Sequence, residues 1–416
     1  MFISTRDYPV LPGTLPSSRP TKARPLLWFA HEVLGGGTLL ASVVMEHASR
    51  LHEQCLVIDT CGPLGPSIYT QEMLDRIDEM SAAGAYTGLI ISEIESMQRA
   101  AIPATGPPGF WTGLAASGVD ISVVTIGAFG PAPFSFEGAI ADLAGYTRLF
   151  DSTDRIRKVT SAAEARAAKD DGVFGVILDF QNSTHARNLD DLDLFYDFGL
   201  RVIQLTYNER NLVADGCTER NPSGLSNYGV SFVNRMNELR ILVDTSHSSE
   251  RTTLDALDVS ERPTAVTHSF AKALHNHDRG KGDDVIKAVG ESGGYLGVLN
   301  VPFFITDEPE GTMNHFIAHF ERIVELAGPE HVGIGTDWGQ VVPKTLIDLL
   351  HEEVRRFGFR PEHRVDFGAQ TRGFETWEKW PNITAALVER GYSDNEIKGF
   401  LGTNFLRVFE RATEGA

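Results

Sequence analysis

The chain has 416 residues, of which 42% are hydrophobic and 22% charged, as in ordinary globular enzymes. Its 37 Lys and Arg residues against 56 Asp and Glu give a net charge of −19. This charge argues against nucleic acid and anionic membrane as partners, because both repel an acidic surface. Three cysteines, a low and odd number, argue against a disulfide framework, and the N-terminus is not a clear signal peptide, so we predict a cytoplasmic protein.

Residues 1–50 are predicted to form an N-terminal arm and a helix. The first 24 or so residues are rich in Pro, Ser, Thr and Arg, which is typical of an arm lying on the surface or on a partner subunit. A helical pattern follows over residues 26–52, broken at Gly35, Gly36 and Gly37. No uninterrupted apolar run reaches the roughly 18 residues that a membrane span needs. We assign residues 51–416 to a single second domain.

From residue 51 onward, short apolar runs alternate with helical patterns. The eight runs are Cys55–Asp59, Val119–Ile126, Val173–Asp179, Val202–Tyr207, Ile241–His247, Thr264–His268, Gly294–Asn300 and His331–Asp337. Most are rich in β-branched residues and all are too short for a typical helix, which favours strands buried on both faces. Helical patterns separate them, for example at 162–169, 190–198, 230–238 and 284–290. This alternation predicts a (β/α)₈ barrel of the α/β class.

Three stretches depart from the repeat. Residues 92–117, with Pro103, Pro107 and Pro108, are predicted to be an inserted loop. Residues 338–380 follow the eighth strand and are predicted to roof the mouth of the barrel. The tail over residues 382–409 is predicted to form two helices, with Ser393 or Asp394 capping the last one.

Polar side chains gather where the predicted strands end, which is where barrels carry their chemistry. They are Asp59, Cys61, Thr125, Asp179, Gln181, Tyr207, Asp244, His247, His268, Asn300 and Asp337. A single His at a strand end is more often a hydrogen-bonded core residue. Two on adjacent strands, His247 and His268, are able to reach one metal ion. In contrast, we expect His275 and His277, which lie in a predicted loop, to face solvent.

Several segments together resemble the renal (membrane) dipeptidase family. They are LTYNERN (205–211), LVDTSHSS (242–249), TAVTHSFAKAL (264–274), HDRGKGDD (277–284) and GIGTDWG (333–339). The resemblance runs from about residue 50 to the C-terminus. It implies a barrel that hydrolyses dipeptides and related amides with two zinc ions sharing a carboxylate, often as a homodimer.

Position by position, the resemblance assigns roles to individual residues. His247 and His268 match the ligands of the second zinc ion, and Asp337 matches the acid–base group at the scissile nitrogen. Arg279 matches the residue that receives the substrate carboxylate. We predict that Gln181, Tyr207 and Asn211 also contact the substrate. His247, His268, Asp337 and Tyr207 are the predicted catalytic residues.

The departures from the family pattern concern the first zinc ion and the bridge. Cys61 and Pro63 stand where the family has a histidine and an aspartate, and proline has no ligand atom. Gln181 stands for the bridging glutamate, and Tyr207 for a histidine over the scissile carbonyl. Two zinc ions close together need a bridging anion to offset their repulsion. We therefore predict at most one zinc ion, held by His247, His268 and Cys61, with Asp337 as an alternative third ligand.

Three functions remain open at this point. The first is hydrolysis of a dipeptide-like or N-acyl amino acid substrate with one zinc ion. The second is a metal-independent isomerase, tautomerase or lyase of small-molecule biosynthesis, in which His247, His268, Asp337 and Tyr207 act as acids and bases. The third is a non-catalytic protein that binds a small molecule on an inactive enzyme scaffold.

Overall fold

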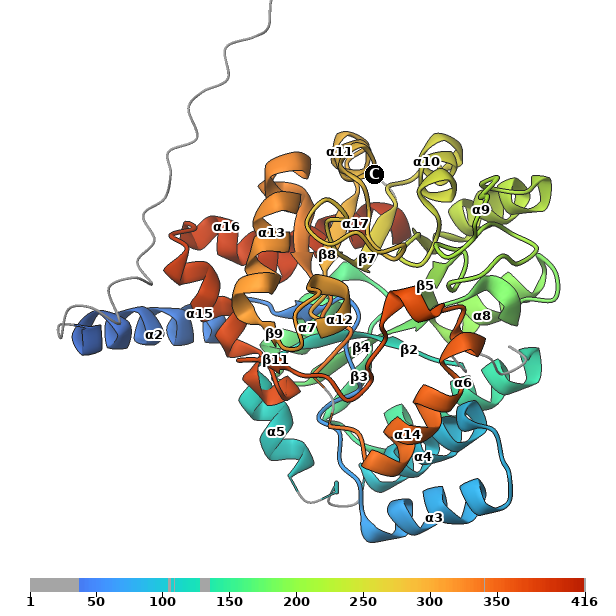
Figure 1. Ribbon diagram of the computed structural model, residues 1–416, viewed down its shortest axis with the longest axis horizontal. Helices are drawn as coiled ribbons and strands as arrows, with labels where there is room; N and C mark the ends of the chain where they lie inside the picture. The colour runs from blue at the N-terminus through green and yellow to red at the C-terminus, as the bar shows by residue number, and fades with distance from the viewer. Residues whose placement is uncertain (1–36, 104–105, 108, 128–134, 340, 415–416) are drawn as a thin grey trace, which may run out of the picture.

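The computed structural model describes residues 37–103, 106–107, 109–127, 135–339 and 341–414 (Figure 1). Most of the predicted N-terminal arm lies outside these residues. The first described helix, α2 (Gly37–Gln54), crosses the predicted boundary at residue 50 and packs against α15 (Pro381–Glu389). Its His52 Nδ1 lies 2.8 Å from Thr384 Oγ1. The helix is thus attached to the barrel domain, and the division of the chain at residue 50 stays a prediction.

Eight parallel strands form the barrel, in the order of the chain except for one added strand. They are β1 (Ile58–Asp59), β2 (Ile121–Thr125), β4 (Phe174–Phe180), β5 (Leu200–Gln204), β6 (Leu242–Asp244), β7 (Ala265–Ser269), β8 (Tyr295–Val298) and β10 (Val332–Ile334). Five of them lie inside their predicted runs, whereas β4 and β7 each extend one residue beyond their runs and β5 begins two residues before its run. The (β/α)₈ fold is therefore confirmed.

Main-chain hydrogen bonds join the first and last strands. Thr60 N donates to Ile334 O at 3.0 Å, and Asp337 N donates to Cys61 O at 2.8 Å. Gly297 and Gly335 lie so close to the Thr267 carbonyl that a Cβ at either position would collide with its oxygen. The closure of the barrel between β1 and β10 thus brings together the residues that follow these two strands.

Helices surround the sheet, as the alternating pattern predicts (Figure 1). They are α6 (Phe136–Ser152), α7 (Ala162–Asp170), α8 (Asp191–Phe198), α9 (Asn227–Leu239), α10 (Glu250–Val259), α11 (Asp283–Glu291), α13 (Met313–Ala327) and α17 (Asn404–Thr413). The apolar residues of the strands and of these helices are buried in a core that surrounds the barrel. The strand β3 (Ile156–Lys158) pairs with β4 outside the barrel order. No predicted run covers it, because it has only three residues.

The prediction of an inserted loop over residues 92–117 is wrong. Helix α4 (Thr87–Ala101) covers its first part and α5 (Phe110–Ser117) its last. The prolines lie between the two helices, where they interrupt neither. Ile90 and Ile94 pack inward from α4, one helical turn apart, so the apolar periodicity there outweighs the proline content.

Residues 338–380 carry helix α14 (Lys344–Glu352) and three short 3₁₀ turns. Helix α14 lies beside α4 and α3 (Gln71–Ala82) (Figure 1). A short strand, β11 (Thr371–Arg372), pairs with β9 (Gly311–Thr312), which follows the short helix α12 (Pro302–Ile305). Leu346 and Leu350 of α14 line a cavity at the mouth of the barrel, which agrees with the predicted roof.

The tail folds as helices, as predicted. Helix α15 is followed by α16 (Asp394–Lys398), a π-helical turn over Gly399–Thr403, and α17. Ser393 caps α16 in a capping box with Glu396. The predicted cap is therefore confirmed at the start of the second helical segment of the tail, which consists of α16, the π-helical turn and α17.

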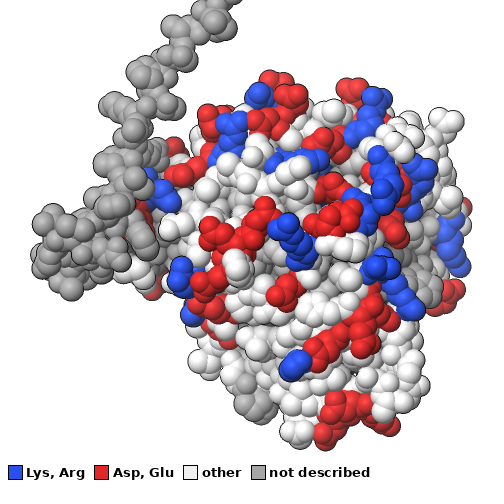
Figure 2. Space-filling view, viewed as in Figure 1, with Lys and Arg blue, Asp and Glu red and all other residues white. Residues whose placement is uncertain are grey.

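No helix among the described residues is long and apolar enough to cross a membrane. On the face shown in Figure 2, basic side chains lie among acidic ones. This interspersed pattern differs from the continuous basic surface that binds nucleic acid.

Candidate active site

Four predicted site residues lie at or just beyond the carboxyl ends of four different barrel strands. Cys61 lies two residues beyond β1, His247 three beyond β6, His268 within β7, and Asp337 three beyond β10. Asp337 has a φ of 50°, one of three non-glycine residues with positive φ among those described. Such backbone conformations are costly and persist where the surroundings fix them. Here the main-chain bond to Cys61 holds Asp337 in place.

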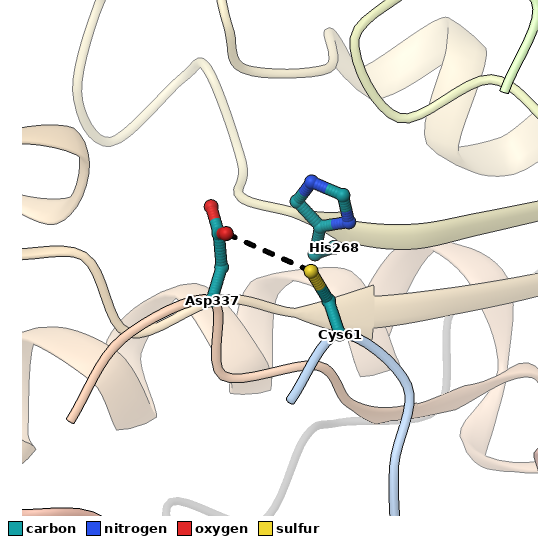
Figure 3. Close-up of side chains that lie close together, drawn as sticks. All are labelled: Cys61, His268 and Asp337. Carbon is teal, nitrogen blue, oxygen red and sulfur yellow. Dashed lines mark hydrogen bonds between the residues drawn. The ribbon is translucent and has the colours of Figure 1, made fainter. Parts of the chain in front are cut away.

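Three of the four side chains form a compact group (Figure 3). A sulfur of Cys61, a ring nitrogen of His268 and a carboxylate oxygen of Asp337 all lie within 4.8 Å of one another. The Cys61 thiol donates to Asp337 Oδ1 at 3.6 Å. The prediction that Cys61 and Asp337 approach the paired histidines thus agrees with the geometry.

The fourth side chain, His247, contacts the ring of His268 through its Nε2 atom. The two Nε2 atoms are 3.1 Å apart. His247 Nδ1 lies 2.7 Å from Asn208 Oδ1, while Asn208 Nδ2 donates to Phe357 O. The Asn208 oxygen must therefore accept, so the proton of His247 lies on Nδ1.

His268 has the same tautomer for a different reason. Its Nδ1 lies 2.9 Å from Thr267 Oγ1, and that hydroxyl already donates to Asp244 Oδ2. His268 Nδ1 is therefore the donor, and its Nε2 carries a lone pair. Two lone pairs thus face each other at 3.1 Å, which is repulsive unless a proton or a cation lies between them.

The surroundings favour the uncharged forms of the two imidazoles and of the Cys61 thiol. Burial, with the charge of Arg279, lowers the pKa of both His247 and His268 well below the ordinary value. Burial, with Asp337 nearby, raises the pKa of the Cys61 thiol well above its ordinary value. Burial also raises the pKa of Asp337 to about 6. Neutral imidazole is the form that binds metal, and an ion would favour the thiolate.

Gln181 and Tyr207 line the same site. Gln181 Nε2 donates to Cys61 Sγ at 3.3 Å. Tyr207 stacks on His247, with ring centroids 4.3 Å apart and an interplanar angle of 22°. Burial raises the pKa of the Tyr207 hydroxyl, so the phenol keeps its proton. Gln181 lines the cavity and Asp179 does not, which supports Gln181 as the residue at the bridging position.

Arg279 and Asn211 lie outside the cavity lining. The Arg279 side chain is fully buried and donates to the main-chain oxygens of Ser246 and His268. Asn211 uses its amide to hold its own loop, through Ser183 and Val213 among others. Substrate contact by either residue would require these hydrogen bonds to break, so both roles stay predictions.

The expectation that His275 and His277 face solvent is wrong. His275 is 9% exposed and His277 5% exposed. His275 Nδ1 donates to Phe304 O at 2.8 Å, and His277 Nδ1 accepts from Arg279 N at 3.0 Å. The loop folds back onto the barrel, where these bonds and the ring contact of His277 with Phe304 hold both imidazoles in the interior, while His277 Nε2 has no hydrogen-bond partner among the described residues.

Asp59 holds the main chain beside the site in place through hydrogen bonds. Its carboxylate is fully buried and accepts five hydrogen bonds, from Cys61 N, Thr336 N, Thr336 Oγ1, Trp377 Nε1 and Trp380 Nε1. It therefore ties the end of β1 to the end of β10 and to the segment that follows. The two tryptophans anchor that segment rather than contact a ligand.

A cavity of about 320 Å³ opens above these residues. Its floor includes Cys61, Gln181, Tyr207, His247 and Asp337. Most of its wall is apolar and comes from the segment after β1 (residues 62–69), from α4, from α14 and from the segments around Phe303 and Phe359. This volume suits a small organic molecule. Helix α4 also adds Glu95 and Arg99, which sequence reasoning missed because that stretch was assigned to a loop.

Comparison with known proteins agrees with the geometry. A sequence model of the membrane dipeptidases (peptidase family M19) matches residues 124–354 and 365–416, more than half of the chain. Dipeptidase tcpJ of Claviceps purpurea is 30% identical over 228 residues, which cover 54% of this chain and 48% of that protein. The chain spans about half the length of the curated relatives that it matches.

Two solved structures share the fold over nearly their whole length. An amidohydrolase from Pseudomonas aeruginosa superposes with a TM-score of 0.69 at 23% identity, covering 88% of this chain and 99% of that one. The probable dipeptidase PvdM from the same organism has a TM-score of 0.67 at 19% identity, covering 90% of this chain and 100% of that one. At such identities these likenesses establish the fold alone.

Proposed function

We propose that this chain, which belongs to the membrane dipeptidase family (peptidase family M19), hydrolyses an amide bond in a small dipeptide-like or N-acyl amino acid substrate with one zinc ion. The observation that carries the proposal is the pair of Nε2 lone pairs 3.1 Å apart on His247 and His268. A divalent cation between them turns a repulsion into two bonds.

The donor set fits one ion. With Zn–N distances near 2.0 Å and Zn–S near 2.3 Å, the ligand atoms of one tetrahedral ion lie roughly 3.3 to 3.6 Å apart. The imidazole pair is close to this spacing, and Cys61 Sγ and Asp337 lie within 4.8 Å of His268. We assign His247, His268 and Cys61 as ligands. Asn208 and Thr267 fix the two ring orientations from behind, as outer hydrogen bonds do in zinc sites.

The donor set does not fit a second ion. Pro63 lines the cavity where the family has an aspartate ligand, and it offers no donor atom there. Gln181 brings a neutral amide whose nitrogen points at Cys61, so no anion bridges two metals.

Each remaining residue has a separate task in the proposed reaction. A zinc ion at this position supplies Lewis-acid polarisation of the scissile carbonyl and an acidified water. Asp337, across from Cys61, moves a proton to the leaving nitrogen. Tyr207 keeps its phenolic proton and donates it in a hydrogen bond to a substrate oxygen. Gln181 orients the substrate amide, and the apolar wall excludes bulk water.

The test combines metal content with turnover. Protein purified without chelator is assayed for zinc by mass spectrometry and for hydrolysis of a panel of dipeptides and N-acyl amino acids. We expect about one zinc per chain, and activity that a chelator removes and zinc restores. Cys61→Ser should lose zinc, whereas Cys55→Ser, a buried cysteine away from the cavity, should keep it.

Turnover that is unaffected by chelation would contradict the proposal. It would favour metal-independent acid–base chemistry by Asp337 and the two histidines instead. Turnover absent from the whole panel, with zinc bound, would leave the metal site standing and remove the proposed reaction.

A further inference from the structure

The cavity lining has a second polar part, contributed mainly by helix α4, that the proposed reaction does not use. Glu95, Gln98 and Arg99 form this part, together with Tyr146 of α6. The catalytic cluster lies on other walls of the same cavity. The rest of the lining is mostly apolar and includes Ile94, Phe110, Val124, Phe303, Leu346 and Phe367. A ligand that touches both Glu95 and the catalytic cluster therefore needs a mostly apolar body with a polar group at each of these two contacts.

Arg99 is already paired within the protein. Its Nη2 donates to Asp142 Oδ1 at 2.6 Å, and Asp142 Oδ2 accepts from Gly127 N at 3.0 Å. The guanidinium also lies over the ring of Tyr146, 4.9 Å from its centroid. The positive charge of Arg99 is thus matched by Asp142, and the side chain is held in place from two sides.

Glu95 has no such partner. No hydrogen bond or ion pair joins its carboxylate to the rest of the described chain. With Arg99 and Asp142, it forms a group of one positive and two negative charges, so this part of the cavity carries one excess negative charge when all three are ionised. Burial raises the pKa of Glu95 to about 7, against the opposing effect of Arg99. Glu95 is partly buried in the cavity lining, and a ligand cation there would offset the cost of burying its unpaired charge.

We propose that Glu95 is a specificity-determining residue that binds a primary ammonium group at the far end of the substrate. The preferred substrate class is then an amide whose acyl part is an apolar chain ending in an amine. Its amide lies at the Cys61 end and its ammonium at Glu95. The identity of the reacting end rests on the proposed function, whereas the recognition of the amine rests on the cavity alone.

The test uses ligands that are not hydrolysed, so that binding is read without turnover. The probes are 8-aminooctanoate and nonanoate, which differ only in an ammonium in place of a methyl group, and the shorter pair 6-aminohexanoate and heptanoate. Dissociation constants are measured by titration calorimetry on the protein as purified. For the pair of probes whose length fits the cavity better, we expect the amine to bind with a dissociation constant at least ten times lower than that of its methyl counterpart.

The matched variants are Glu95→Gln and Glu93→Gln. Glu93 lies on the same helix but pairs with Arg76 at the surface. Glu95→Gln should abolish or invert the preference, and Glu93→Gln should leave it unchanged. Equal or tighter binding of the methyl probes by the unaltered protein, an unchanged preference in Glu95→Gln, or no binding of any probe would each overturn the inference. Amine preference without hydrolysis of any amide would remove the proposed function and leave this inference standing.

Discussion

Replacing Asp59 by Asn tests whether one buried carboxylate holds together the residues that follow the first strand, β1, and the last strand, β10. Oδ1 accepts from Cys61 N and Thr336 N, and Oδ2 accepts from Thr336 Oγ1 and from the indoles of Trp377 and Trp380. An asparagine replaces one of these oxygens by a donor. Whichever way the amide turns, at least two N–H or O–H groups lose their acceptor in the interior.

The magnitude follows from those two lost bonds. A buried donor left without an acceptor costs about 2 kcal/mol, so Asp59→Asn should destabilise the fold by about 4 kcal/mol. For 416 residues the unfolding entropy is about 0.9 kcal/mol/K, which gives a fall in Tm of about 5 °C. Scanning calorimetry measures it, with Asp171→Asn as control. Asp171 pairs with Arg157 at the surface and should cost less than about 1 kcal/mol. A Tm for Asp59→Asn within 1 °C of that control would refute the reasoning.

Three further predictions follow from the same contacts. His268→Ala should weaken zinc binding at least about 100-fold in a competition titration, whereas His331→Gln, a histidine away from the cavity, should not change it. His363 and Arg360 lower the pKa of Asp278, so that carboxylate stabilises the fold above about pH 4 and loses this effect at lower pH. The Tm difference between the unaltered protein and Asp278→Asn should therefore narrow below pH 4, and a difference that stays constant to pH 3 would contradict this. Glu95, facing Arg99 on its own helix and Asp142 on α6, has a folded pKa of about 7, above its unfolded value. Stability should thus fall as pH rises from about 4 to 7, and Glu95→Gln should stabilise the protein at pH 8 by up to about 3 kcal/mol with no gain at pH 4.

The convergence of the site was predictable because strand order fixes it. The ends of adjacent parallel strands meet at one face of a barrel, so His247 and His268 had to lie close once their strands were identified. Cys61 joins them because the barrel closes between β1 and β10, which brings the residue after the first strand beside Asp337. The residues that make both contacts lie within three residues of a strand end, so the contacts depend little on the path of the longer loops.

The parts that sequence reasoning missed depend on contacts made by loops. The tautomers of the two histidines are set by Asn208 and by Thr267 with Asp244, and only the Thr267 contact is local in sequence. His275 and His277 lie in a polar stretch that reads as surface, yet a fold of the loop buries them against Phe304. Polar composition alone does not reveal such burial.

Glu95 was missed for a different reason. The prolines after residue 102 led us to assign the whole stretch to a loop, although they end helix α4 rather than prevent it. The signal that could have found the helix was the spacing of Ile90 and Ile94, one turn apart on the buried face. A helix there places Glu95 next to Ile94 on the cavity wall.

The most direct test of the single-ion site is an anomalous difference map from crystals grown with zinc, recorded at the zinc absorption edge. We predict one peak bonded to His247 Nε2, His268 Nε2 and Cys61 Sγ. Two peaks roughly 3.5 to 4 Å apart, the spacing of a two-metal centre, would contradict it. So would a map in which the space between the two imidazoles stays empty at saturating zinc.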